Sequence, residues 1–163
     1  MDVGNLADQV GGAWQRHNEV MLYLLDEIPS AGLKAVPADS RGRDVAAQFH
    51  HLIRVREGWV HFHTTGRRPT LERFDKAKPP IKAQLKKALR DSGKSVGTFL
   101  ERALRGEAKP RMFGGQVVRW LAYLLEHESH HRGQMMLALK QAGLRLPERV
   151  AVDGLWGKWI RGK

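Results

Sequence analysis

Apolar residues recur three and four positions apart along four long stretches of the chain, the spacing that places them on one face of an α-helix. The stretches cover residues 5–28, residues 43–65, a segment of roughly twenty-five residues after Pro79-Pro80, and residues 117–142. Proline and glycine occur at the breaks between these stretches. In no run do apolar and polar residues alternate as they do in a β-strand. Four long helices with short connections predict an all-α fold, an up-and-down antiparallel four-helix bundle in a single domain of residues 1–163.

The last segment, residues 144–163, is shorter and carries Trp156 and Trp159 in a basic amphipathic turn. This pattern predicts a short C-terminal helical tail. The two tryptophans can dock on the bundle, seal a pocket or meet a second subunit.

The centre of the fourth stretch interrupts its apolar pattern with three histidines. His127 and His131 project about 40° apart, on the same side as Trp120 and Leu124, whereas His130 lies nearer the polar side. Two imidazoles one turn apart can supply two ligands to one metal ion. Two inward histidines can also be hydrogen-bonded core residues, so a metal site requires a third ligand elsewhere.

The second stretch contains four histidines, of which His51 is the best candidate for the third ligand. His51 projects beside Val55 at the edge of the apolar face, whereas His50 and His61 point outward. His50 is the alternative ligand, because it directly precedes His51 in the sequence. His63 faces inward in the last, fraying turn, and we expect His50, His61 and His63 to be exposed to solvent.

Residues 127–131 match His-Glu-x-x-His, the motif of zinc metalloproteases in which the glutamate is the general base. Those proteases hold an extended peptide along a strand, and no strand is predicted here. Their third ligand lies downstream, where only Glu148 and Asp153 remain and no histidine follows. Metalloprotease is therefore a minor alternative. Glu128 lies inside the apolar face, where it can act as a general base, orient a ligating ring or hydrogen-bond another helix.

Four other residues are candidates for a role near this site. His17 lies on the apolar face of the first stretch, and we expect a hydrogen-bonded core histidine there, with lining of a shared cavity as the alternative. Gly133 costs about 1 kcal/mol relative to alanine inside a helix, which favours close approach of a neighbouring helix or a ligand. Arg132 and Gln134 are expected to orient the site or an anionic substrate, with the surface as the alternative for Arg132.

The amino-acid composition limits which metal ligands and nucleophiles the chain can supply. The chain has no cysteine, so a metal site must use His, Asp and Glu, and the protein has no thiol nucleophile of its own. The lack of cysteine fits a reducing compartment, and neither a signal peptide nor a membrane-spanning apolar run is visible. We therefore expect a cytoplasmic protein.

The net charge is +11, which favours anionic partners. One basic ridge repeats every fourth residue, as the solvated face of an amphipathic helix does: Lys78, Lys82, Lys86, Arg90 and Lys94. No recognition helix, zinc finger or aromatic RNA-binding platform is visible. We expect no specific nucleic-acid partner, and weak nonspecific binding at low salt.

The histidine-bearing stretches resemble a known family. The segment from Leu125 to Gly143, with His127, His131 and Arg132-Gly133-Gln134 in register, resembles the fourth helix of the DinB/YfiT-like metalloenzymes. Residues 43–59, with His51 before Leu52, resemble the second helix of that family. The resemblance extends over nearly the whole chain in helix order and length.

This resemblance implies a homodimeric up-and-down four-helix bundle with a divalent metal on His51, His127 and His131. Some members use a low-molecular-weight thiol, such as bacillithiol or mycothiol, as cosubstrate. Three neutral imidazoles leave an open coordination position, where a metal lowers the pKa of bound water or thiol. Imidazole suits zinc and nickel, so we expect one of these. The expected function is a thiol-dependent transferase or a hydrolase acting on a small molecule, and the alternative is a non-catalytic binding protein.

Overall fold

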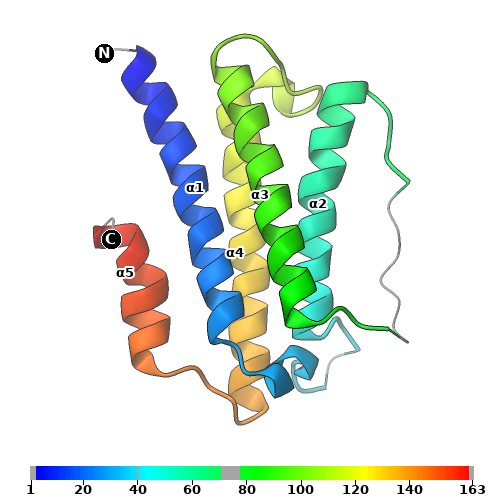
Figure 1. Ribbon diagram of the computed structural model, residues 1–163, viewed down its shortest axis with the longest axis vertical. Coiled ribbons are helices and arrows are strands. Elements are labelled where there is room, and N and C mark those ends of the chain that lie inside the picture. The colour runs from blue at the N-terminus through cyan, green and yellow to red at the C-terminus, as the bar shows by residue number, and fades with distance from the viewer. Residues whose placement is uncertain (1–2, 40, 71–77, 162–163) are drawn as a thin grey trace.

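The computed structural model describes residues 3–39, 41–70 and 78–161, and these residues form an all-α fold, as predicted (Figure 1). The four long helices are α1 (Val3–Glu27), α2 (Val45–Thr65), α3 (Lys82–Leu104) and α4 (Val117–Gln141). Shorter helical segments are η1 (Ser30–Lys34), η2 (Phe113–Gly115), η3 (Arg149–Trp156) and α5 (Gly157–Arg161). None of the described helices combines the length and the hydropathy that a bilayer span requires.

The ends of α2 are fixed by local chemistry, which sets the position of its histidines. Asp44 caps the N-terminus, where its Oδ1 accepts a hydrogen bond from the Ala47 N–H at 2.7 Å. Gly66 ends the helix in the left-handed conformation, with φ of 75°, and its N–H donates to the Phe62 carbonyl. The two caps define a helix of 21 residues that presents one continuous face to α3 and α4.

The four long helices do not alternate in direction. Arg56 of α2 contacts the Leu89 carbonyl of α3 at 3.0 Å, and His63, further along α2, packs its ring against Phe99, further along α3. Helices α2 and α3 therefore run parallel, as the colours of Figure 1 also show. The predicted up-and-down antiparallel order is wrong because the connection between these helices, residues 66–81, is not short: it is long enough to pass from one end of the helices to the other.

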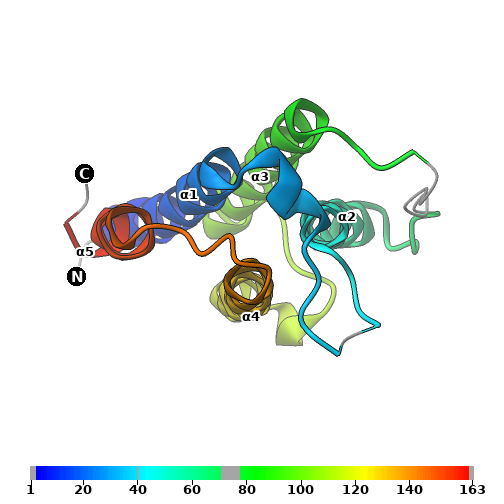
Figure 2. The ribbon, with the colours of Figure 1, turned by 90° about the horizontal axis from the view of Figure 1, so that it is seen from below.

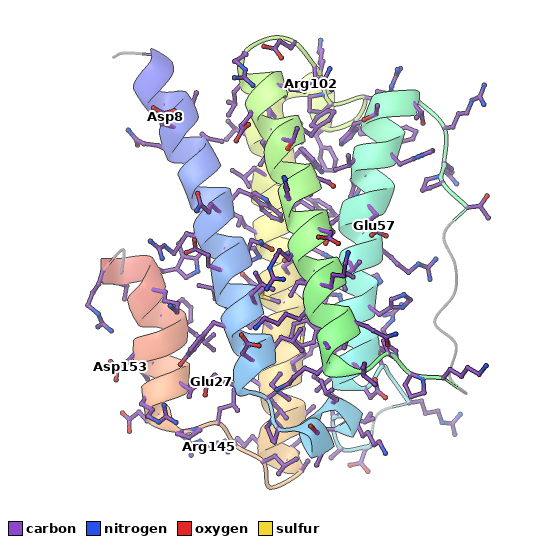
Figure 3. All side chains as sticks on the ribbon, viewed as in Figure 1. Asp8, Glu27, Glu57, Arg102, Arg145 and Asp153 are labelled. Atoms are coloured by element: carbon purple, nitrogen blue, oxygen red, sulfur yellow. The ribbon has the colours of Figure 1, made fainter. Side chains whose placement is uncertain are left out.

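Viewed along the helices, α1, α3 and α2 form a curved row, and α4 lies on one side of that row in contact with all three (Figure 2). Close approach of α1 and α3 depends on Gly93, whose carbonyl accepts a hydrogen bond from Trp14 Nε1 at 2.8 Å. A Cβ at this position would overlap the Asn18 side chain. Charged side chains such as Asp8, Arg102 and Asp153 lie at the periphery (Figure 3).

The interior contains two apolar clusters. The larger one is formed by the second half of α1, the first halves of α2 and α3, the second half of α4 and the tail, and includes Met21, Leu24, Phe49, Leu89 and Leu139. The other includes Trp14, Val96, Phe99, Trp120 and Leu124.

Buried polar residues occupy the level between the two apolar clusters. Every long helix contributes one: His17 from α1, Arg56 from α2, Ser92 from α3 and Glu128 from α4. Each of these side chains is at most 2 % exposed. Such a polar layer is costly unless its groups satisfy one another, so its contacts define the middle of the molecule.

The C-terminal tail is helical, as predicted, and docks on α1 and α4. The Tyr23 ring of α1 abuts Gly154, and the Lys158 ammonium lies over the same ring, 5.1 Å from its centroid. From α4, the Arg132 guanidinium lies 5.1 Å from the centroid of Trp156. Figure 1 shows the tail beside α1.

Candidate metal centre

Three histidines from α2 and α4 meet in one cluster: His51, His127 and His131. One ring nitrogen from each lies within 4.8 Å of the others. The ring centroids are 5.3 Å apart for His51 and His127, 4.9 Å for His51 and His131, and 4.8 Å for His127 and His131. His127 and His131 converge because they are one turn apart on α4, and antiparallel α2 brings His51 to the same level.

The environment keeps these imidazoles neutral. Burial lowers the pKa of His51 to about 4, assisted by the nearby Arg43 and then His127. Burial likewise lowers the pKa of His131 to about 4, with His127 and His51 adding to the effect, and lowers the pKa of His127. A neutral imidazole offers one nitrogen lone pair, which is the form that binds a metal.

Gln48, one turn before His51 on α2, orients the ring of His131. Its Nε2 donates to the Arg43 carbonyl at 3.4 Å, which leaves its Oε1 facing His131 Nδ1 at 3.2 Å. A neutral His131 donates this hydrogen bond from Nδ1–H and keeps its lone pair on Nε2. Helical periodicity did not single out Gln48, although a glutamine between the apolar residues Val45 and Phe49 was a usable signal.

His127 differs because its Nδ1 is buried and has no hydrogen-bond partner in the described part of the chain. Its ring stacks on Tyr123, with centroids 5.7 Å apart and planes inclined by 16°. A buried imidazole nitrogen without a partner is costly in a purely structural histidine. This nitrogen is therefore consistent with the missing partner being a bound ion.

Glu128, next to His127, faces a separate network. Its two carboxylate oxygens accept hydrogen bonds of 2.6 Å from Arg56 Nε and Nη2, and Oε2 lies 2.9 Å from His17 Nε2. Burial alone would raise the pKa of Glu128, but the charge and hydrogen bonds of Arg56, with the hydrogen bond of His17, lower it to about 2. The carboxylate thus forms the hydrogen bonds to other helices that were one of its three predicted roles.

The partners of Glu128 are themselves held in place. Arg56 is fully buried, and its Nη1 donates to Asn18 Oδ1 at 2.8 Å and to the Leu89 carbonyl at 3.0 Å. This guanidinium therefore links all four long helices. His17 is the hydrogen-bonded core histidine that the sequence predicted. Arg56 was missed, although it continues the inward face of Leu52 on α2.

Two cavities open beside the cluster, of about 1010 Å³ and about 640 Å³. They share three lining residues, His51, Arg43 and Arg54. Cavities of this size accommodate small molecules. The candidate metal centre is therefore accessible from the α2 side of the protein.

The family model for the DinB family matches residues 4–161. The chain belongs to the DinB family. The match includes both helices that carry the three histidines, so it confirms the family resemblance seen in the sequence. A search of curated proteins found no match.

The structure also places the remaining histidines of this DinB protein. His51, and not its neighbour His50, joins the cluster. His50 is half-buried rather than exposed, and His61 is exposed, as predicted. His63 is only 3 % exposed, so its predicted exposure is wrong. The last turn of α2 does not fray, because Arg111 covers it: the Arg111 N–H donates to His63 Nδ1 at 3.2 Å, and Arg111 Nε donates to the His63 carbonyl.

In this DinB protein the described contacts of the three residues after His131 lie outside the histidine cluster. The Arg132 guanidinium packs on Trp156 and holds the tail, so the described contacts do not place it at the cluster. Gly133 is exposed and a Cβ there would meet no described atom within 4 Å, so the expected close approach of a neighbouring helix is wrong for the described helices. Gln134 contacts the exposed His130, with Nε2 atoms 3.0 Å apart. Arg132 and Gln134 are both half-buried.

Proposed function

We propose that this DinB protein binds one divalent metal ion through His51, His127 and His131. The observation that carries the proposal is the convergence of three ring nitrogens, from helices distant in sequence, within 4.8 Å of one another. Two further contacts support it. Gln48 occupies one nitrogen of His131 and leaves the other as a ligand, and the buried Nδ1 of His127 has no partner among the described residues.

The donor set favours a catalytic role over a purely structural one. Three protein ligands leave a coordination position for water or substrate, and a metal bound there would lower the pKa of a coordinated water or thiol. Zinc and nickel both suit imidazole nitrogen. Because the chain has no cysteine, a thiol nucleophile would come from a second small molecule. We therefore propose a low-molecular-weight-thiol-dependent transferase or a hydrolase, acting on a small molecule as a cytoplasmic homodimer.

Within this proposal, Glu128 acts as a positioning residue. The His-Glu-x-x-His alternative requires Glu128 to take a proton, but both of its oxygens accept hydrogen bonds from Arg56. The protease mechanism is therefore less well supported than one in which the Arg56–Glu128 pair holds α4 in register with α2. This register brings His127 and His131 to His51.

The test is the metal content of untagged protein, measured by mass spectrometry for the wild type, His51→Ala and His50→Ala. We expect about one metal per chain in the wild type and in His50→Ala, and none in His51→Ala. The adjacent histidine is a matched control, because the same substitution is made one residue away on the same helix. Equal metal contents in all three proteins, or loss only in His50→Ala, would contradict the proposed ligand set.

Activity is tested separately by supplying low-molecular-weight thiols and electrophilic substrates to the metal-loaded wild type and to His131→Ala. Faster thiol consumption by the wild type supports an enzyme. If a metal-loaded wild type and His131→Ala consume thiol at equal rates, a non-catalytic binding protein becomes the better description.

A further inference from the structure

The smaller cavity beside His51 combines basic and apolar lining residues. Along α2 its lining residues recur three and four positions apart, so one helix face forms its floor: His51, Arg54, Val55, Gly58, Trp59 and Phe62. The segments that flank the helix complete it with Arg43, Arg68, Pro69 and Met112. We call this the arginine cavity. Its volume of about 640 Å³ is that of a small-molecule site.

The charge of the arginine cavity has one sign. Arg43, Arg54 and Arg68 line it, and no carboxylate occurs among its described lining residues. Arg54 is half-buried, whereas Arg43 and Arg68 are exposed. A guanidinium presents a planar fork of N–H donors that matches a carboxylate or phosphate, and burial strengthens such contacts. Three guanidiniums around one cavity thus favour an oxyanion.

The larger cavity, which His51 also lines, is likewise lined by basic side chains. It shares Arg43 and Arg54 and adds Lys34, Arg41 and Lys82. Its described carboxylate is Asp44, which already accepts the Ala47 N–H as the cap of α2. Basic side chains therefore outnumber carboxylates among the described lining residues of both cavities, although Arg54 also interacts electrostatically with Glu57.

The rest of the arginine cavity is apolar. Trp59, Phe62 and Val55 belong to the α2 floor, and Met112 also lines the cavity. The Trp59 ring is held by its neighbours: its centroid lies 6.1 Å from that of Phe62 and 5.0 Å from that of Phe113. A fixed aromatic surface together with a flexible methionine accommodates a planar or branched apolar group.

We propose that the arginine cavity binds the substrate of the metal centre, and that this substrate is a small oxyanion with an aromatic or branched apolar body. Arg54 and Arg68 contact the oxyanion, and the apolar body packs on Trp59. Since His51 belongs to both the cavity and the histidine cluster, a molecule bound here lies next to the metal position. The reactive role of the molecule rests on the proposed function, whereas its binding by arginine does not.

The experiment compares two probes that differ only in charge, naphthalene-2-carboxylate and naphthalene-2-carboxamide, titrated into the full chain by calorimetry. Chelator is present in one series and zinc in a second. We expect the carboxylate to bind at least about tenfold more tightly than the carboxamide, and Arg54→Gln and Arg68→Gln each to reduce that preference by about tenfold or abolish it. Arg67→Gln is the matched control, since it removes an equal charge one residue from Arg68 but outside the cavity lining.

Each result decides the proposal. The proposal is supported if both cavity variants lose the preference for the carboxylate and Arg67→Gln keeps it. If the half-buried Arg54 is needed for folding, Arg68→Gln alone still tests the proposal. Equal affinity for both probes, or an equal loss in Arg67→Gln, overturns it. A preference that needs zinc and survives in both cavity variants also overturns it, because the metal then binds the anion. Arginine-dependent binding in a chain that takes up no zinc would retain the anion site and refute the metal centre alone.

Discussion

Two groups of buried polar side chains lie next to each other on α4 and differ in how completely their hydrogen-bonding atoms are used. Glu128 accepts hydrogen bonds from Arg56 and His17, and Arg56 in turn contacts Asn18 and the Leu89 carbonyl. One residue earlier, His127 keeps a buried Nδ1 without a partner in the described chain. The complete network is explained by its own hydrogen bonds, whereas His127 combines an unpartnered buried nitrogen with a place in the three-histidine cluster, which favours a bound ion.

The largest expected effect comes from breaking the complete network. Arg56→Met leaves the Glu128 carboxylate buried without its main partner, and should lower the free energy of unfolding by about 3–5 kcal/mol. Urea unfolding at pH 7 with chelator present measures this effect. The double variant Arg56→Met/Glu128→Leu should regain part of the lost free energy of unfolding, because no buried charge then lacks a partner. A loss in Arg56→Met no greater than that in the exposed Arg90→Met would show that the network contributes little.

His63 provides a further comparison with His127. Its Nε2 is also buried without a described partner, but His63 lies outside the described histidine cluster. Burial, with the charge of Arg111, lowers its pKa from 6.5 to about 4. In the unfolded chain His63 therefore takes up a proton at a higher pH than in the folded chain. Its contribution to acid sensitivity begins as the pH falls below about 6.5 and is complete near pH 4.

Across this range the wild type should lose up to about 3 kcal/mol more stability than His63→Gln, measured by urea unfolding of metal-free protein at each pH. His51 and His131 titrate in the same window, but they contribute equally to both proteins and cancel in the difference. Parallel stability curves for the two proteins would rule out a shifted pKa at His63.

Metal affinity should depend on the hydrogen bond to Gln48 that orients His131 within the cluster. Gln48→Leu removes the acceptor that faces His131 Nδ1, and should raise the zinc Kd about 10–100-fold in a chelator competition assay. Gln48→Glu retains an acceptor oxygen at the same position and should keep most of the affinity. Equal weakening in both variants would indicate a packing effect instead of ring orientation.

The smallest effect is expected outside both groups. Arg132→Gln removes the cation over Trp156 and should lower the free energy of unfolding by about 0.5–1 kcal/mol, with metal content unchanged. Trp156→Leu is the reciprocal variant, and a double-mutant cycle isolates the pair. A fall in metal content in Arg132→Gln would connect this face of α4 to the cluster after all.

Helical periodicity alone predicted most of the secondary structure and part of the candidate metal centre. It predicted the four long helices and placed His127 and His131 on one face, because their spacing is a local property of one helix. It also favoured His51 over His50 by angle, and His51 is the one in the cluster. Periodicity carries no direction, however, so it did not reveal that α2 and α3 run parallel.

The missed residues depend on partners that are distant in sequence. Arg56 lies 72 positions from Glu128, and neither residue reveals the other in its own helix. His63 was expected to be exposed because it lies near a helix end, but Arg111, 48 positions away, covers it. Gly133 was interpreted as a close contact and faces solvent. Local patterns identify faces, whereas burial at a helix end depends on what the rest of the chain brings there.

The long connection between α2 and α3 has a consequence for how this protein can diversify. Its two ends contribute to different cavities: Arg68 and Pro69 line the arginine cavity, and Pro79, Pro80 and Ile81 line the larger one. Doubling the length of a connection between helices costs only about 0.6 kcal/mol in loop-closure entropy. Insertions and substitutions at the two ends of this connection can therefore reshape both cavities while the helices that carry the three histidines stay unchanged, so the cavity walls can vary independently of the histidine cluster.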